Sequence, residues 1–160
     1  IVPANLLLHN TKGEKRLMNY ESLADGGFET GTMLGSGGFI VLDEDQCIVR
    51  HTMTLARFYN HESCGQCSPC REGTGWMYKI LKKIEFGEGT MEDIDLLWDI
   101  QRRIEGNTIC PLGDAAAWPV AAAIRHFRDE FEWHVKNPEL AQTQNYGIAH
   151  YADPIHVPQV

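Results

Sequence analysis

The chain has 160 residues, of which 43% are hydrophobic and 22% charged, a composition typical of a soluble globular protein with a core. The formal net charge of −8 argues against binding to nucleic acid or to an anionic membrane surface, because both bind clustered Lys and Arg. No apolar run approaches the roughly 20 residues that span a bilayer, so no direct membrane insertion is expected. The chain starts at Ile1 without methionine, and we expect it to be a piece of a larger or processed protein.

Residues 1–46 contain short apolar runs and turn residues, a pattern that predicts the end of a small α+β module. We expect a strand over 5–9, its return over 16–20 and a further short strand over 39–42. The glycines of 31–38 invite a phosphate-loop interpretation. A tight connection is favoured instead, because these glycines lead into a strand and no lysine follows them.

From Cys47 onward, apolar residues recur at helical spacing and predict four amphipathic helices. The second helix opens at Ser68 with a proline in its first turn, and the third opens at Thr90, which forms a capping-box pattern with Asp93. The residues expected on the apolar stripes are Ile48, Thr52, Leu55, Ala56 and Tyr59, then Trp76, Met77, Ile80, Leu81 and Ile84, then Ile94, Leu97, Trp98, Gln101 and Ile104, and finally Val120, Ile124, Phe127, Phe131 and Val135.

Four amphipathic helices joined by short loops predict an antiparallel four-helix bundle over 47–136, in a protein of mainly α class. Asp114 can cap the fourth helix, and Pro119 should kink that helix or set its start. Residues 137–160 show little periodicity and predict an extended C-terminal tail that lies on a partner.

Four of the five cysteines form one pattern. Cys64, Cys67 and Cys70 are spaced Cys-x2-Cys-x2-Cys, and Cys110 follows forty residues later, directly before Pro111. A [4Fe–4S] cluster needs four thiolates at the corners of a tetrahedron, and a short loop can supply three of them while a remote segment supplies the fourth. The spacing therefore predicts that these four cysteines bind a [4Fe–4S] cluster at one end of the bundle.

Structural zinc is the main alternative, although zinc sites usually offer two Cys-x2-Cys pairs. It would make the chain a zinc-stabilised interaction domain without a redox role. A disulfide pair is weaker still, since nothing marks a small secreted chain. No hydrolytic constellation is present, and a cluster whose four corners are all cysteine leaves no open site for a substrate. The residues by themselves therefore predict an electron-transfer domain without catalytic residues.

Other side chains have weaker signals. Cys47 lacks a partner at motif spacing and is expected to pack as a small apolar residue. Arg71 either tunes the cluster or is a surface arginine, and His61 faces solvent or caps a helix. His126 and His134 are expected to be structural residues on a helix surface. We expect all four tryptophans in the core, at positions Trp76, Trp98, Trp118 and Trp133.

Residues 62–73 closely resemble the C-terminal region of the NADH- and flavin-binding F subunit of NADH–quinone oxidoreductase, respiratory complex I. The resemblance covers roughly residues 17–136, and its further matches are Leu34–Gly38, Arg57–Tyr59, Cys110–Pro119 and Ile124–Phe127. It implies a ubiquitin-like module followed by a four-helix bundle, with Cys64, Cys67, Cys70 and Cys110 as the ligands of a [4Fe–4S] cluster.

The resemblance further implies that NADH passes a hydride to FMN, which hands single electrons to this cluster on their way to quinone. FMN and NADH are expected on a missing N-terminal segment, so this fragment alone should not oxidise NADH. The expected partners are other subunits of the complex, on the cytoplasmic face of a bacterial inner membrane or the mitochondrial matrix side. Diaphorase subunits of NAD-linked hydrogenases and formate dehydrogenases are similar and stay open as alternatives.

Overall fold

The computed structural model describes residues 8–9, 15–16, 40–42 and 46–142. The chain divides into two compact units, Ile1–Leu42 and Asp43–Val160. In the first unit, strand β1 (Leu8–His9) pairs antiparallel with strand β2 (Lys15–Arg16). This pair agrees with the strand and return predicted from the sequence.

The strand predicted over 39–42 is wrong for its described part. Residues 40–42 have no regular secondary structure, and the side chains of Ile40 and Val41 are 69% and 90% exposed. The run is apolar, but an apolar run forms a strand only where a neighbouring strand pairs with it. The glycine-rich stretch 31–38 lies outside the described residues.

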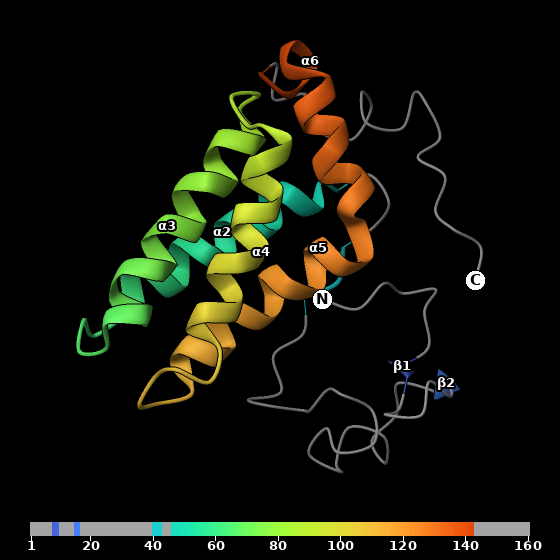
Figure 1. Cartoon of the computed structure of the whole chain (residues 1–160). Coiled ribbons are helices and arrows are strands. Elements are labelled where there is room, and N and C mark those ends of the chain that lie inside the picture. The colour runs from blue at the N-terminus through green and yellow to red at the C-terminus, as the bar shows by residue number, and fades with distance from the viewer. Residues whose placement is uncertain (1–7, 10–14, 17–39, 43–45, 143–160) are drawn as a thin grey trace. The chain divides into compact units, whose positions relative to one another are not determined.

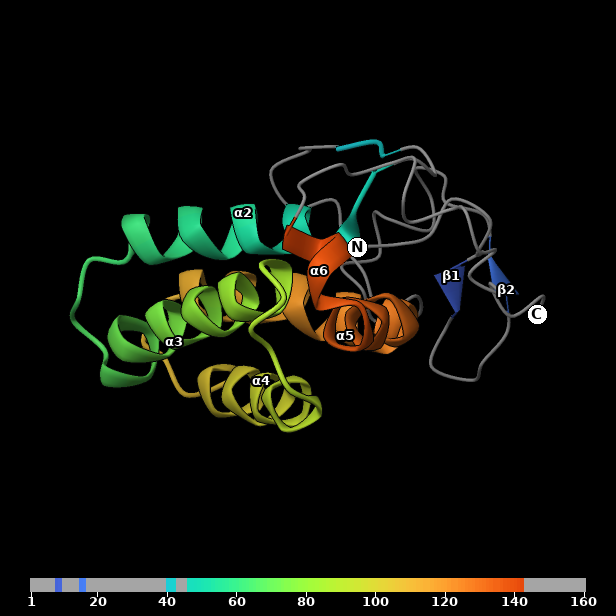
Figure 2. The same cartoon turned by 90° about the horizontal axis from the view of Figure 1, so that it is seen from above.

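The second unit is helical. Its elements are α2 (Ile48–Glu62), α3 (Ser68–Glu85), α4 (Met91–Ile104), α5 (Leu112–Lys136) and the short α6 (Pro138–Gln142). Helices α2 and α4 lie on opposite sides of α3, and α5 packs against all three (Figures 1 and 2). The predicted mainly α class and four-helix bundle are thereby confirmed. Among the helices of the described residues, none combines the length and apolarity that a membrane span needs.

The predicted apolar stripes form the core, with Met77, Leu81, Ile94 and Leu97 fully buried. Not every residue predicted in the core is buried: Leu55, Tyr59, Phe127 and Val135 are half-buried, and none of the four tryptophans is buried. Trp76 is 52% exposed and Trp118 is 43% exposed. An indole at the rim of a core can keep its N–H on a polar partner. Trp118 does so, because its Nε1 donates to Glu105 Oε1 at 2.9 Å.

Helix α4 begins with the predicted capping box. The backbone N–H of Asp93 donates to Thr90 Oγ1 at 3.2 Å, and the N–H of Thr90 donates to Asp93 Oδ2 at 2.9 Å. Lys83 at the end of α3 adds an ion pair to the same carboxylate at 2.8 Å. Asp93 therefore both starts α4 and ties it to α3.

We expect Asp93→Ala to lower the free energy of unfolding by about 1–2 kcal/mol, the usual effect of losing a cap. Burial alone would raise the pKa of the Asp93 carboxyl, but hydrogen bonds from Lys83 and Thr90 hold it below its ordinary value of 3.8. Because the folded-state pKa is lowered, the stabilisation is present above pH 3.8 and is lost as the pH falls through the folded-state pKa. Denaturant unfolding across this range measures both effects. Glu92→Ala, an exposed change in the same first turn, is the control and should have an effect within about 0.5 kcal/mol.

The start and the break of α5 differ from the prediction. The helix begins at Leu112, and Asp114 does not cap it, since its Oδ1 accepts the N–H of Gly106 at 2.7 Å. Pro119 lies inside the helix, and the non-helical backbone is at Phe127, with φ −134° and ψ 29°. Proline fixes φ near the helical value, so it removes a hydrogen bond without itself leaving the helical region.

The segment expected as an extended tail starts with a helix. Helix α5 ends at Lys136, as Asn137 and Pro138 predicted, but α6 then occupies Pro138–Gln142. The turn after α3 packs against its start, because a Cβ added at Gly87 would lie 2.8 Å from the Cα of Pro138. The rest of the tail lies outside the described residues.

Candidate metal centre

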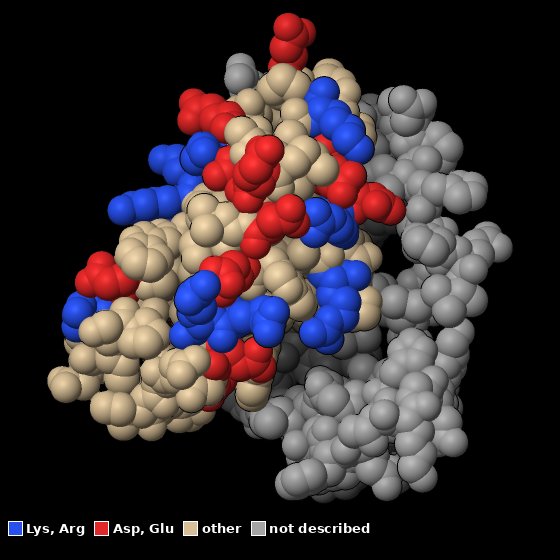
Figure 3. All heavy atoms as spheres, viewed as in Figure 1, with Lys and Arg blue, Asp and Glu red and all other residues tan. Residues whose placement is uncertain are grey.

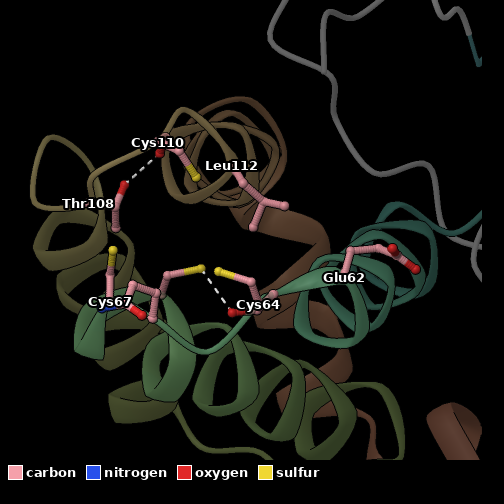
Figure 4. Close-up of a pocket in the computed structure, with 9 residues that line it drawn as sticks. Glu62, Cys64, Cys67, Thr108, Cys110 and Leu112 are labelled. Atoms are coloured by element: carbon pink, nitrogen blue, oxygen red, sulfur yellow. Dashed lines mark hydrogen bonds between the residues drawn. The ribbon is translucent and has the colours of Figure 1, made fainter.

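Two loops meet at one end of the bundle. The loop at 63–67 joins α2 to α3, the loop at 105–111 joins α4 to α5, and both lie at the same end in the two views (Figures 1 and 2). The structure thereby brings together all four cysteines predicted as ligands. Cys64, Cys67, Cys70 and Cys110 line one hollow of about 130 Å³ (Figure 4). Its other lining residues are Glu62, Ser63, Gln66, Thr108 and Leu112.

The first loop is shaped by Gly65 and Arg71. Gly65 has a φ of +79°, in the left-handed region that favours glycine. The Arg71 guanidinium donates to the carbonyl oxygen of Gly65 at 2.8 Å, to Ser68 Oγ at 3.3 Å and to a carboxylate oxygen of Glu72 at 2.9 Å. The sequence alone leaves two roles for Arg71, either tuning of the cluster or a place on the surface. Its side chain is 46% exposed, and its contacts brace the loop that carries Cys64.

The second loop is fixed from both sides. At its start, the N–H of Gly106 donates to Asp114 Oδ1 at 2.7 Å. Near its end, Thr108 Oγ1 donates to the carbonyl oxygen of Cys110 at 3.0 Å. The N–H of Ile109 donates to Cys67 Sγ at 3.4 Å, which joins the two loops directly. The fourth cysteine is therefore positioned by hydrogen bonds and not only by the chain direction.

The sulfur atoms differ in exposure and in polar contacts. Cys70 is 7% exposed and its Sγ lies 3.2 Å from Ser63 Oγ, whereas Cys64 and Cys110 are exposed. An N–H or O–H group that donates to sulfur stabilises a thiolate, which is the form that binds metal. Cys67 and Cys70 each have such a neighbour, so the site suits thiolate ligands.

The spacing of the sulfurs tests what the hollow fits. Four thiolates on one zinc ion lie about 3.8 Å apart, since each Zn–S bond is about 2.3 Å. In the part of the chain that the structure describes, the one group of His, Cys, Asp or Glu ligand atoms all within 4.8 Å of one another is Cys47, Glu85 and His134. The four cysteines surround a space instead of converging on a point. That arrangement fits a group of several atoms, such as an iron–sulfur cluster, better than a single ion.

The remaining candidate residues lie elsewhere. Cys47 is buried as expected, but it also caps α2 by accepting the N–H of Arg50 at 3.4 Å. His134, expected on a helix surface, is fully buried, and its Nε2 lies 3.4 Å from Cys47 Sγ. Its spacing of three from Phe131 places it on the buried side of α5, and that spacing was the signal for its burial. His61 is exposed and pairs with Glu62 at 2.9 Å, and His126 is exposed.

We expect Gly113→Ala to disturb the metal centre without touching a ligand. A Cβ at this position would lie 2.9 Å or less from three side-chain atoms of Thr108, which lines the hollow and holds Cys110. Overpacking should lower the free energy of unfolding by about 1–3 kcal/mol. The iron bound per chain, measured by metal analysis, should also fall. The double variant Gly113→Ala/Thr108→Gly removes the clash but also the hydroxyl that holds Cys110, so it should recover only part of the iron. Unchanged iron in the single variant would contradict this account of the loop.

The family described as the NADH-ubiquinone oxidoreductase-F iron-sulfur binding region matches residues 50–134, which include all four cysteines of the hollow. The F subunit of NADH-quinone oxidoreductase in Rickettsia typhi is 48% identical over 78% of this chain and 28% of its own length. Its counterpart in Rhodobacter capsulatus is 42% identical over 85% of this chain and 29% of its own length. The chain therefore spans less than a third of these relatives.

Two solved structures share the fold. NAD+-reducing [NiFe]-hydrogenase in the air-oxidized state aligns with a TM-score of 0.65 and 29% identity, over 84% of this chain and 21% of that chain. The H2-reduced state aligns with a TM-score of 0.57 and 34% identity, over 64% and 19%. Since the family match covers more than half of the sequence and the whole cysteine site, the chain belongs to the family of the NADH-ubiquinone oxidoreductase-F iron-sulfur binding region.

Proposed function

We propose that the chain binds a [4Fe–4S] cluster through Cys64, Cys67, Cys70 and Cys110 and serves as an electron-transfer module of an NADH–quinone oxidoreductase. The observation that carries this proposal is the meeting of four cysteines from two distant loops around one hollow. The family description and the names of the two bacterial relatives support the same assignment.

The bound cluster would supply transfer of one electron at a time. The chain's own residues hold the ligands and set their surroundings. The N–H of Ile109 and the hydroxyl of Ser63 lie against the sulfurs of Cys67 and Cys70, and such donors favour the reduced state of a cluster. Packing of Cys70 against the helices restricts water on that side of the site.

The exposed side of the site provides a route for electrons. Cys110 is exposed, and its neighbour Ile109 has a side chain that is 83% exposed. Figure 3 shows acidic and basic side chains mixed over the helices, while the end of the bundle that carries the two loops is largely uncharged in this view. An uncharged, partly apolar end suits contact with a second redox protein of the complex.

Under this proposal, oxidation of NADH to NAD+ and a proton releases two electrons to FMN. These pass singly through the cluster and reduce quinone with two protons. FMN and NADH would bind a part of the larger protein outside this chain, so the fragment alone would be inactive. The protein would be peripheral, on the cytoplasmic or matrix side of the membrane. The likeness to NAD+-reducing hydrogenase favours the related diaphorase subunit as a second candidate.

The test uses the intact complex that contains this chain. NADH added without oxygen should produce the EPR signal of a reduced [4Fe–4S] cluster. In a Cys110→Ala complex, NADH should still reduce the flavin and an artificial acceptor that takes electrons from it, while quinone reduction should fall by at least about 100-fold. Undiminished quinone reduction without this cluster would contradict the proposal. Electrons that reach a hydrogenase centre instead of quinone would favour the second candidate.

A further inference from the structure

A second group of metal-ligating side chains lies at the other end of the bundle. Cys47 directly precedes α2, Glu85 is the last residue of α3, and His134 is in the last turn of α5. The cysteine hollow begins at the opposite end of these same helices. Because α2 has 15 residues, the two places are separated by about 22 Å, at 1.5 Å per residue.

We propose that Cys47, Glu85 and His134 bind a single zinc ion that fastens α2, α3 and α5 together, separate from the four-cysteine site. All three side chains are buried, with Cys47 3% exposed and the other two fully buried. Thiolate, imidazole and carboxylate are the ligands that zinc takes in proteins.

The distances among the three ligand atoms match a zinc site. Cys47 Sγ lies 3.7 Å from Glu85 Oε2 and 3.4 Å from His134 Nε2, and the last two atoms are 3.5 Å apart. Zinc bonds of about 2.3 Å to sulfur and about 2.0 Å to nitrogen or oxygen place tetrahedral ligands about 3.3–3.6 Å apart. With bonds of these lengths, the three observed distances give ligand–zinc–ligand angles of about 104–122°, close to the tetrahedral value. The side chains are already at the spacing that one ion requires.

The second contact of the histidine supports ligation. His134 Nδ1 lies 2.8 Å from the carbonyl oxygen of Glu130, which can only accept, so Nδ1 carries the hydrogen. In the neutral ring, the lone pair is then on Nε2, the atom that faces Cys47 and Glu85. Metal-binding histidines usually donate their other N–H to a carbonyl or carboxylate in this way. The ring is thus oriented and in the correct tautomer for a metal.

The charges around the group favour a divalent cation. The carboxylate of Glu130 is 6% exposed and its Oε1 accepts the N–H of Ile48 at 2.7 Å, beside Cys47. Two buried carboxylates beside a thiol are costly without a compensating positive charge. Zinc would supply that charge on binding, with the thiol proton of Cys47 released to water, and Glu130 would be a candidate fourth ligand.

The test is metal analysis of the full chain in its complex, purified without chelators. We expect about one zinc per chain in addition to the cluster iron, as bound on purification or after addition of zinc chloride and desalting. Zinc X-ray absorption should show one sulfur at about 2.3 Å and nitrogen or oxygen ligands at about 2.0 Å. A shell of four sulfurs would place the zinc elsewhere and overturn the proposal.

Matched variants separate the two sites. Cys47→Ser keeps a side chain that caps α2 but is a poor zinc ligand, and Glu85→Gln keeps the shape of its side chain. Each should lower zinc by roughly tenfold or more and leave iron and sulfide unchanged. Cys110→Ala should lower iron and sulfide and leave the zinc content unchanged. Absence of zinc from the iron-loaded wild-type chain after zinc addition, or zinc retained in Cys47→Ser, would overturn the proposal without affecting the electron-transfer function.

Discussion

Replacement of Cys110 by alanine is expected to lower bound iron and sulfide from about four each per chain to less than one, since a cubane needs its fourth thiolate. The helices should remain, because Cys110 is exposed in a loop and contributes no buried apolar surface. Chemical analysis of anaerobically purified protein measures the loss of the cluster. Far-ultraviolet circular dichroism measures the retained helix.

The chain offers its own control for this variant. Cys47 is the fifth cysteine and lies outside the hollow, so Cys47→Ser should keep iron, sulfide and the reduced-state EPR signal. Full iron content and an unaltered EPR signal in Cys110→Ala would contradict the assignment of this residue as a ligand.

Phe131→Ala should cause the largest loss of stability among single core substitutions. Among the residues that the structure describes, Phe131 is the largest of the fully buried side chains, and it lies on the face of α5 that meets the bundle. Deleting a buried aromatic ring removes its transfer free energy and leaves a cavity, which together cost about 3–5 kcal/mol. The thermal midpoint, followed by circular dichroism at a fixed heating rate, should fall by roughly 10 °C.

The matched control is another phenylalanine on the same bundle. Phe58 in α2 has a side chain that is 55% exposed, so Phe58→Ala should change stability by less than about 0.5 kcal/mol. Equal shifts in the two variants would mean that the packing of α5 against the bundle is not what stabilises the fold.

Local patterns predicted much of the fold. Helical spacing indicated the stripes that include Met77 and Leu97, and a four-residue pattern indicated the capping box of Thr90 and Asp93. These signals are contained in one or two helical turns, so the sequence displays them directly. The spacing of Cys64, Cys67 and Cys70 restricts the kind of site, and the structure places these residues and Cys110 around one hollow, while their role as cluster ligands stays a prediction.

The features that sequence reasoning missed depend on distant contacts. Asp114 was expected to cap its own helix, but Gly106 on the preceding loop offers it an N–H group at 2.7 Å. Cys47 is 38 residues from Glu85 and 87 from His134, and no local pattern links positions so far apart. Their meeting follows from the packing of the bundle, which brings the start of α2 beside the ends of α3 and α5.

The most direct test of the four-cysteine site is iron and acid-labile sulfide content of the anaerobically purified full protein, with EPR after reduction by dithionite. We expect about four irons and four sulfides for this site and the spectrum of a reduced [4Fe–4S] cluster, and both should be lost in Cys110→Ala. Wild-type protein without sulfide, in which the four cysteines hold zinc and dithionite changes no spectrum, would contradict it.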